Sequence, residues 1–243
     1  MTVANIHAHK ILILDYGSQY TQLIARRVRE IGVYCEIFPW DSEQAEAFLT
    51  QAQGVILSGG PESTTHDHTP TVPDYVIKAA LPILGICYGM QALVSQLGGQ
   101  VRPSSQREFG FAQITLAREC VLFAGLSDAS NAQGQSLLDV WMSHGDKVTA
   151  IPAGFACVAS TPNAEFAVVA DEASKIYGLQ FHPEVTHTSK GREILSAFLF
   201  DVCACSADWT AGNIIEDQMK QVQTQLRDEH VILGLSGGVD SSV

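Results

Sequence analysis

Short aliphatic runs alternate with amphipathic stretches at the start of the chain, and this alternation restricts the possible folds more than any other feature. The runs are Ile11 to Leu14, Val33 to Phe38, Val55 to Leu57 and Ile83 to Ile86, each typical of a short buried strand. Between the first two, Tyr20 to Ile31 carries apolar residues at helical spacing. Strands that alternate with helices predict a parallel sheet covered on both faces, so the runs can be continuously apolar. We therefore expect an α/β fold with a mainly parallel open sheet flanked by helices.

The middle of the chain, from about Val101 to Phe181, contains shorter β-rich pieces separated by Gly, Pro and Asn. These pieces are Ala112 to Leu116, Phe155 to Ala159, Ala167 to Ala170 and Ile176 to Phe181. They predict additional strands, some of them antiparallel. A helix from about Lys190 to Cys203 is expected to complete a first domain, which we place at residues 10–208.

Residues 209–243 predict the start of a second unit. Apolar residues recur there at helical spacing, at Ile215, Met219, Val222 and Leu226, and a strand is expected at Val231 to Leu235. The loop that follows consists of Ser236, Gly237, Gly238, Val239, Asp240, Ser241 and Ser242. Such a loop between a strand and a helix can wrap pyrophosphate with backbone N–H groups and hydroxyls, although it lacks the Lys of a Walker A loop.

Composition excludes several classes of protein. Hydrophobic residues make up 46% of the chain and the net charge is −12, which favours a large core and disfavours nucleic acid or an anionic membrane as partner. Met1 to Lys10 lacks the pattern of a secretory signal, and no apolar run is long enough to span a bilayer, so we expect a cytoplasmic protein without a membrane segment. The six cysteines are dispersed, and the closest pair, Cys203 and Cys205, lacks metal-site spacing, so no metal site is expected.

The strongest chemical signal is Gly85-Ile86-Cys87-Tyr88-Gly89, between the run that ends at Ile86 and an amphipathic helix. Glycines two residues before and after Cys87 relieve the crowding of a tight strand-to-helix turn, the form of a nucleophile elbow. The helix N-terminus also favours a thiolate at this position. The alternative is a buried structural cysteine beside ordinary turn glycines, but the flanking pattern favours a nucleophile.

A thiol nucleophile needs a base and a group that orients the base. His182-Pro183-Glu184 follows the run at Ile176 to Phe181, so His182 should reach the same sheet edge and Glu184 should orient it. Ser58-Gly59-Gly60-Pro61 follows another strand, and the backbone N–H groups of Gly60 and Tyr88 could form an oxyanion hole. Taken alone, a Gly-Gly-Pro sequence is only a turn.

These three motifs, in this order, resemble the class I (triad) glutamine amidotransferases over about residues 10–208. Asp15-Tyr16-Gly17-Ser18-Gln19 and Ser143-His144-Gly145-Asp146 narrow the resemblance to the family of glutamine-hydrolysing GMP synthetases. The loop at residues 236–242 resembles the pyrophosphate-binding loop of the ATP pyrophosphatase domain that follows in those enzymes, as if the chain were cut just after it. The implied fold is a flavodoxin-like core.

The resemblance assigns roles residue by residue. Cys87 is the nucleophile, His182 the general acid and base, and Glu184 the orienting carboxylate, with Gly60 and Tyr88 as the oxyanion hole. The expected contacts to the amino acid end of glutamine are Gln91, Ser143, His144 and Gly145. No cofactor is implied for the amidotransferase domain, whereas the full-length enzyme is expected to use ATP, Mg and xanthosine monophosphate (XMP) and to be a homodimer.

The resulting hypothesis is an amidotransferase that hydrolyses glutamine to glutamate and ammonia, and the ammonia would aminate XMP to GMP in purine nucleotide biosynthesis. Alone, this chain would be at most a glutaminase. Two alternatives stay open. The chain could belong to a different synthetase, or it could be a catalytically silent regulatory or binding module in which Cys87 senses redox state.

Overall fold

The structure is a computed structural model that describes residues 5–226, 229, 232 and 234. Its centre is one ten-stranded sheet with the strand order β2-β1-β3-β4-β10-β9-β8-β5-β7-β6. The strands are β1 (Lys10–Asp15), β2 (Tyr34–Pro39), β3 (Gly54–Leu57), β4 (Ile83–Ile86), β5 (Gln100–Leu116), β6 (Ala129–Ser130), β7 (Ser136–Ala150), β8 (Ala156–Ser160), β9 (Val168–Asp171) and β10 (Ile176–Leu179). The pairs among β2, β1, β3, β4 and β10 are parallel, and from β10 to β6 every pair is antiparallel. The expected fold class is therefore confirmed.

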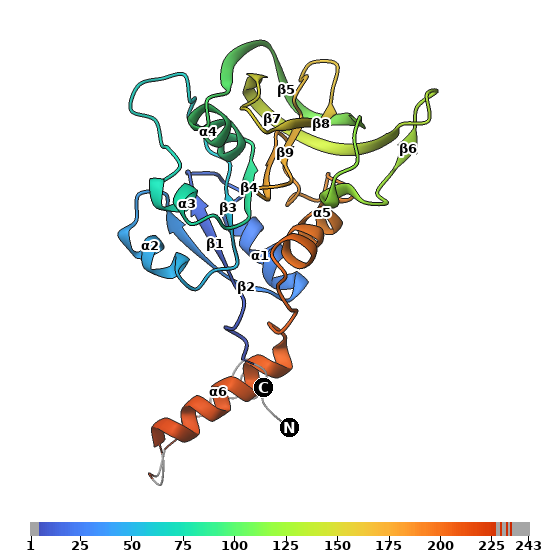
Figure 1. Cartoon of the computed structure of the whole chain (residues 1–243). Helices are drawn as coiled ribbons and strands as arrows, with labels where there is room; N and C mark the ends of the chain where they lie inside the picture. Colours follow the sequence, from blue (N-terminus) through green and yellow to red (C-terminus); the bar gives the residue numbers. More distant parts are fainter. Residues whose placement is uncertain (1–4, 227–228, 230–231, 233, 235–243) are drawn as a thin grey trace.

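Helices cover both faces of the parallel half (Figure 1). They are α1 (Thr21–Ile31), α2 (Glu43–Leu49), α3 (Asp74–Lys78), α4 (Tyr88–Gln96) and α5 (Gly191–Ala197), which continues as a π-helical turn over Phe198–Val202. A 3-10 turn, Val121–Phe123, follows β5.

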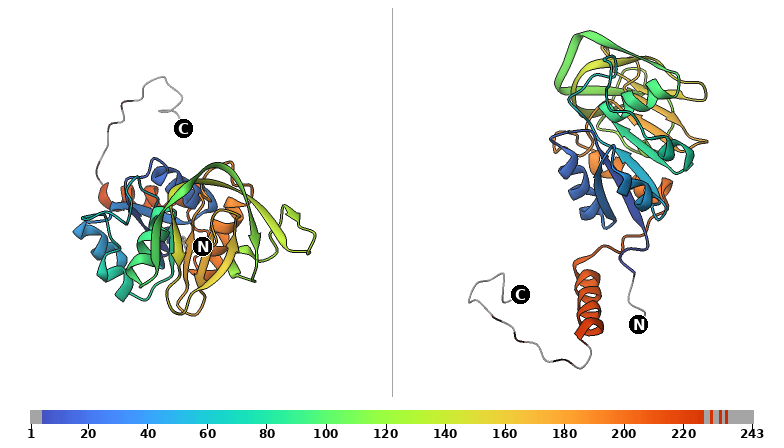
Figure 2. Two further views of the ribbon diagram at one scale, coloured as in Figure 1. Left: turned by 90° about the horizontal axis from the view of Figure 1, so that it is seen from above. Right: turned by 90° about the vertical axis from the view of Figure 1, so that its left-hand side faces the viewer.

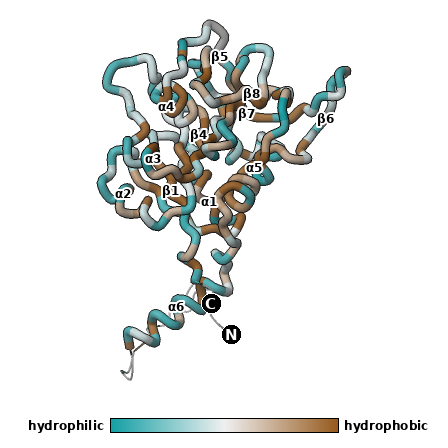
Figure 3. Tube along the Cα trace, viewed as in Figure 1, coloured by the Kyte–Doolittle hydropathy of each residue, from teal (hydrophilic) through white to brown (hydrophobic). Residues whose placement is uncertain are grey.

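Strand β1 shows why the first runs are continuously apolar. Ile11 and Ile13 pack in one cluster with residues of α1 and α5, whereas Leu12 and Leu14 pack in a second cluster with residues of α2, α3 and α4. Successive side chains of a strand point to opposite faces, so a strand between two helical layers buries every residue. The hydropathy trace accordingly concentrates its apolar segments in the centre of the molecule (Figure 3).

The antiparallel half differs because β5 and β7 form a long ribbon at the top of Figure 1. In β7 buried residues alternate with half-buried ones from Leu138 to His144, the pattern of a sheet with one face partly open to solvent. The prediction of added strands, some antiparallel, is confirmed. Strand β7 was not among the predicted strands, because its polar residues hide the apolar alternation.

Helix α6 (Ala211–Leu226) projects away from the rest of the molecule (Figure 2). None of its residues is buried, and Ile215, Met219 and Val222 are exposed. The amphipathic helix is thus confirmed as a helix. Most of the expected strand at residues 231–235 and the whole loop at residues 236–242 lie outside the described residues.

Candidate active site

Cys87 lies at the turn between β4 and α4, where its backbone has φ 51° and ψ −106°. Residues with a Cβ rarely adopt this conformation, which costs about 1–3 kcal/mol and persists only where the surroundings hold it. The Cys87 N–H donates to Leu179 O at 2.7 Å, and its carbonyl accepts from Gln91 N at 3.1 Å. The neighbouring strand and the first turn of the helix therefore hold the turn at both ends.

The glycines on either side of Cys87 are required by packing. A Cβ on Gly85 would lie 2.7 Å from Met90 N, and a Cβ on Gly89 would lie 2.5 Å from Leu57 O. Both neighbouring atoms belong to the backbone and cannot move aside. The Gly-x-Cys-x-Gly pattern is thus explained by the close approach of α4 to β4 and to β3.

His182 and Glu184 form a buried pair beside this turn. His182 Nδ1 lies 2.7 Å from Glu184 Oε1, and the two residues are only 3% and 1% exposed. The backbone of His182 is fixed on both sides, since its N–H donates to Trp141 O at 3.0 Å and its carbonyl accepts from Thr188 Oγ1 at 2.6 Å. Because Nδ1 is engaged by Glu184, Nε2 is the ring nitrogen left for Cys87.

Burial and hydrogen bonding have opposite effects on the pKa of His182. Burial opposes protonation of His182, but hydrogen bonds with Cys87 and Glu184 outweigh burial and raise the pKa of His182 to about 10. Glu184 Oε2 is buried and has no hydrogen-bond partner among the described residues, so the neighbouring imidazole is the group that compensates this carboxylate. The arrangement favours an imidazolium next to the sulfur.

The turn after β3 brings a third backbone segment to the site. Ser58 Oγ accepts a hydrogen bond from Tyr16 N at 3.0 Å, which ties this turn to the end of β1. A Cβ on Gly59 would lie 3.1 Å from His182 Cε1, and one on Gly60 would lie 2.7 Å from Tyr16 O. Only glycine allows the backbone to approach this closely.

A cavity of about 350 Å³ opens next to Cys87. It is lined by Gly60, Pro61, Glu62, Ser63, Cys87, Tyr88, Gln91, Phe109, Ser143, His144, Gly145 and Asp146. The structure therefore brings together, around one cavity, the nucleophile, both expected oxyanion-hole residues and all four expected glutamine contacts. His182 and Glu184 do not line the cavity, and His182 reaches the site through its hydrogen bond with Cys87.

The wall formed by residues 143–146 of β7 contacts the nucleophile directly. Cys87 Sγ donates to Ser143 O at 3.4 Å, and Gln91 Nε2 donates to Asp146 O at 2.9 Å. His144 turns its imidazole inward, with Nδ1 at 2.9 Å from Asp146 O and Nε2 at 3.0 Å from Glu108 Oε2. Burial lowers the pKa of His144, and Glu108 partly offsets that effect.

Two residues of this site, Gln180 and Glu108, were not predicted from the sequence. Gln180 is fully buried, and its Nε2 lies 3.8 Å from Cys87 Sγ. Its position two residues before His182 was the available signal, because alternate residues of a strand share a face. Glu108 had no comparable signal, since it reaches the site only through the pairing of β5 with β7.

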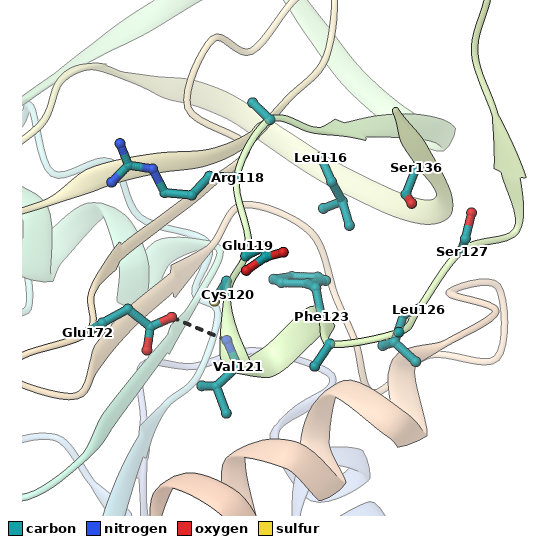
Figure 4. Close-up of a pocket in the computed structure, with 13 residues that line it drawn as sticks. Leu116, Arg118, Glu119, Cys120, Val121, Phe123, Leu126, Ser127, Ser136 and Glu172 are labelled. Carbon is teal, nitrogen blue, oxygen red and sulfur yellow. Dashed lines mark hydrogen bonds between the residues drawn. The ribbon is translucent and has the colours of Figure 1, made fainter. Parts of the chain in front are cut away.

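A larger cavity, of about 910 Å³, lies away from the triad around the turn after β5 (Figure 4). Figure 4 shows the side chains of Arg118 and Glu119 at the edge of this cavity. It also shows the hydrogen bond that Val121 N donates to Glu172 Oε1, at 3.2 Å. Burial raises the pKa of the Cys120 thiol to about 12, aided by Glu172. A thiol of this kind stays protonated at neutral pH, so Cys120 is not an activated nucleophile.

The four remaining thiols outside the site also have raised pKa values. Burial raises the pKa of each of them, at Cys35, Cys157, Cys203 and Cys205. Within the described ranges, no group of three or more His, Cys, Asp or Glu side chains is arranged to hold a metal ion. No described helix is both long enough and apolar enough to cross a membrane.

Comparison with known proteins agrees with the geometry of the site. Residues 12–202 match the family model described as glutamine amidotransferase class-I. The chain belongs to the class I glutamine amidotransferase family.

Relatives and solved structures extend this assignment. This amidotransferase chain is 57% identical to a "GMP synthase [glutamine-hydrolyzing]" of Yersinia enterocolitica and 58% identical to one of Proteus mirabilis, over 98% and 99% of its own length. It covers 46% of each of these relatives, so it spans about half of their length. A protein described as a GMP synthase subunit, from Thermoplasma acidophilum and 28% identical, superposes with a TM-score of 0.66 over 90% of this chain and 98% of its own. PurLQS of Thermotoga maritima shares the fold, with a TM-score of 0.61 at 18% identity over 79% of this chain and 97% of its own.

Proposed function

We propose that this chain hydrolyses the side-chain amide of glutamine to glutamate and ammonia. The observation that carries the proposal is the buried His182–Glu184 pair beside Cys87, at a strained turn that opens into a cavity. A cavity of about 350 Å³ has room for an amino acid. The thiol in the larger cavity, Cys120, is by contrast held protonated by burial.

The reaction has two halves. In the first, His182 accepts the thiol proton, and the Cys87 sulfur attacks the amide carbon of glutamine, giving a tetrahedral oxyanion. Gly60 and Tyr88 both line the cavity, and their backbone N–H groups would hold this oxyanion. When the C–N bond breaks, His182 gives its proton to the leaving nitrogen, so that ammonia and a γ-glutamyl thioester form.

In the second half, His182 removes a proton from water, and the resulting hydroxide attacks the thioester. The C–S bond breaks, glutamate leaves, and the proton returns to the sulfur. The net reaction is glutamine plus water to glutamate plus ammonia. Glu184 keeps Nε2 of His182 directed at the sulfur throughout by holding Nδ1.

We further propose that the ammonia serves GMP synthesis in a longer protein. The supporting observation is the identity of about 57% to relatives named GMP synthase, about half of whose length this chain spans. In that protein ATP with Mg would activate XMP, and the loop at Ser236–Ser242, which lies outside the described residues, would hold the pyrophosphate. We infer that residues 10–208 form the amidotransferase domain and that residues 209–243 begin the nucleotide domain. We also infer that the full-length protein is a homodimer in the cytoplasm.

Replacing the nucleophile tests the proposed hydrolysis. Cys87→Ala should abolish ammonia release from glutamine and also abolish the covalent adduct that mass spectrometry detects after mixing with glutamine. Cys120→Ala is the matched control, because it removes another buried thiol outside the site. Ammonia release by Cys87→Ala at the wild-type rate would reject the mechanism.

The acceptor is tested separately. The full-length protein supplied with glutamine, ATP and XMP should form GMP. Glutamine hydrolysis without GMP formation would favour a different synthetase, and absence of the adduct in the full-length protein would favour a silent module.

A further inference from the structure

Gln180 is a polar side chain that is fully buried next to the nucleophile. It follows β10, and its backbone N–H is already used, since it donates to Ala167 O at 2.9 Å. The side-chain amide must therefore find its own partners, because a buried amide without hydrogen bonds costs folding free energy. Its two partners are Gln91 and the sulfur of Cys87.

The orientation of this amide follows from a chain of hydrogen bonds. The carbonyl oxygen of Asp146 can only accept, so the atom of Gln91 that lies 2.9 Å from it must be the donor Nε2. The same NH₂ group lies 3.2 Å from Gln180, and it can donate there only to Oε1. The other end of the Gln180 amide, Nε2, must therefore face Cys87 Sγ at 3.8 Å.

We propose that Gln180 is a further catalytic residue, whose amide N–H donates to the Cys87 sulfur and stabilises the thiolate that attacks glutamine. This inference rests on the proposed glutamine hydrolysis. The neutral thiol donates to Ser143 O, but the thiolate has no proton to donate and becomes a stronger acceptor. The hydrogen bond from the Gln180 amide to the sulfur therefore becomes stronger as the sulfur ionises. An interaction that strengthens in this way lowers the barrier to attack on glutamine.

Two polar groups from one stretch of chain therefore serve the thiolate. His182 takes the proton, and Gln180 donates from the end of β10 on the same stretch of chain. Gln91 links this donor to the wall at Asp146, so the wall of the cavity and the sulfur are connected through two amides. The other titratable groups that line the cavity are Glu62, Tyr88, His144 and Asp146.

The test measures the thiol directly, with iodoacetamide as the probe. Gln180→Met keeps the approximate volume and removes the donor. We expect its alkylation rate at neutral pH to fall by about tenfold, the effect of losing one hydrogen bond to a charged group, and the midpoint of the rate against pH to move to higher pH. The kcat for glutamine should fall by a similar factor with little change in KM.

The matched control is Gln96→Met, the same substitution in α4, at a side chain that exchanges hydrogen bonds with Val72 outside the cavity. It should leave the midpoint and kcat unchanged. A folded Gln180→Met variant with the wild-type midpoint and wild-type kcat would overturn the proposal.

Gln180→Glu provides a second variant if the methionine disturbs folding. The carboxylate still accepts from Gln91 but places negative charge at the sulfur, so alkylation should be slower than in the wild type, and an equal or faster rate would overturn the proposal. Alkylation needs no glutamine, so the experiment distinguishes failure of the proposed hydrolysis from failure of the proposed role of Gln180. A wild type that alkylates at Cys87 but releases no ammonia rejects the hydrolysis, whereas an unshifted midpoint rejects the role of Gln180.

Discussion

Glu184 lies two residues after His182, and its Oε1 is 2.7 Å from His182 Nδ1. The short separation in sequence means that one tight turn builds both members of the pair. Arg27 Nε donates to the backbone oxygen of Glu184 at 3.0 Å, so α1 also anchors this turn. The orientation of the imidazole is thus fixed by local structure together with one contact from a distant helix.

The first prediction concerns the charge of Glu184. Glu184→Gln keeps the size of the side chain but removes the charge that stabilises the imidazolium, and a flipped amide would select the wrong tautomer. We expect kcat for glutamine hydrolysis to fall by about a hundredfold or more, with a smaller change in KM. Ammonia release at saturating glutamine measures it. Glu172→Gln, which changes a carboxylate at the Cys120 cavity, should retain wild-type activity.

The second prediction concerns pH and stability. In the native state the pKa of His182 is raised from 6.5 to about 10, so in that window the native state binds more protons than the unfolded state. The contribution of His182 to the free energy of unfolding is complete below about pH 6.5 and is lost as pH rises to about 10, by at most about 1.4 kcal/mol per pH unit. The free energies of unfolding of the wild type and of His182→Gln, measured with urea, should therefore converge at high pH. A difference that stays constant from pH 6 to 10 would contradict this assignment.

The third prediction concerns the support of the cavity wall. Glu108 joins three segments, because its carboxylate contacts His144 at 3.0 Å and accepts from Thr161 Oγ1 and Asn163 Nδ2, each at 3.2 Å. Each ring nitrogen of His144 faces an oxygen, Nδ1 a backbone carbonyl and Nε2 this carboxylate, so Glu108 helps to orient the imidazole.

Removal of that carboxylate should loosen the wall. Glu108→Ala should raise KM for glutamine by about tenfold, because the segment that faces the substrate loses its anchor, whereas kcat should change less. Glu108→Gln can donate to His144 and accept from Thr161, so it should recover most of the lost affinity. Equal KM values for the alanine variant and the wild type would show that the wall holds without this contact.

The fourth prediction concerns the turn glycines. Gly89→Ala would place a methyl group 2.5 Å from Leu57 O, so α4 must move away from β3. We expect a loss of roughly 2–4 kcal/mol in the free energy of unfolding, with loss of activity as Cys87 shifts. Gly212→Ala, in α6, is the control, since a Cβ there meets nothing within 4 Å. It should be neutral or slightly stabilising.

The parallel half of the sheet was predictable from sequence because burial on both faces leaves each strand as an uninterrupted apolar run. Residues Ile11–Leu14 and Val55–Leu57 are wholly buried, and no polar residue obscures them. The ribbon of β5 and β7 has one partly open face, so its polar residues mask the period of two. Its length depends on a long-range pairing that no local pattern specifies.

The same distinction applies to the site. Cys87, His182 and Glu184 lie in local motifs at strand ends, where glycine and proline mark the turns. Gln180 and Glu108 are ordinary polar residues by sequence, and they gain a role only when β10 brings one to the sulfur and β5 brings the other to β7. Contacts between distant segments therefore limit what sequence alone predicts.

The last prediction concerns where the packed unit ends. The Trp209 N–H donates to Gly32 O at 2.9 Å, and its ring centroid lies 4.8 Å from that of Tyr34, whereas α6 buries no residue. A chain that ends after Thr210 should therefore keep the thermal stability and glutaminase rate of the 243-residue chain. A chain that ends after Cys205 loses the Trp209 contacts and should lose about 1–3 kcal/mol in the free energy of unfolding. Thermal and urea unfolding of the two shortened chains test this prediction. A marked loss of stability in the chain that ends after Thr210 would contradict it and would mean that α6 stabilises the amidotransferase fold.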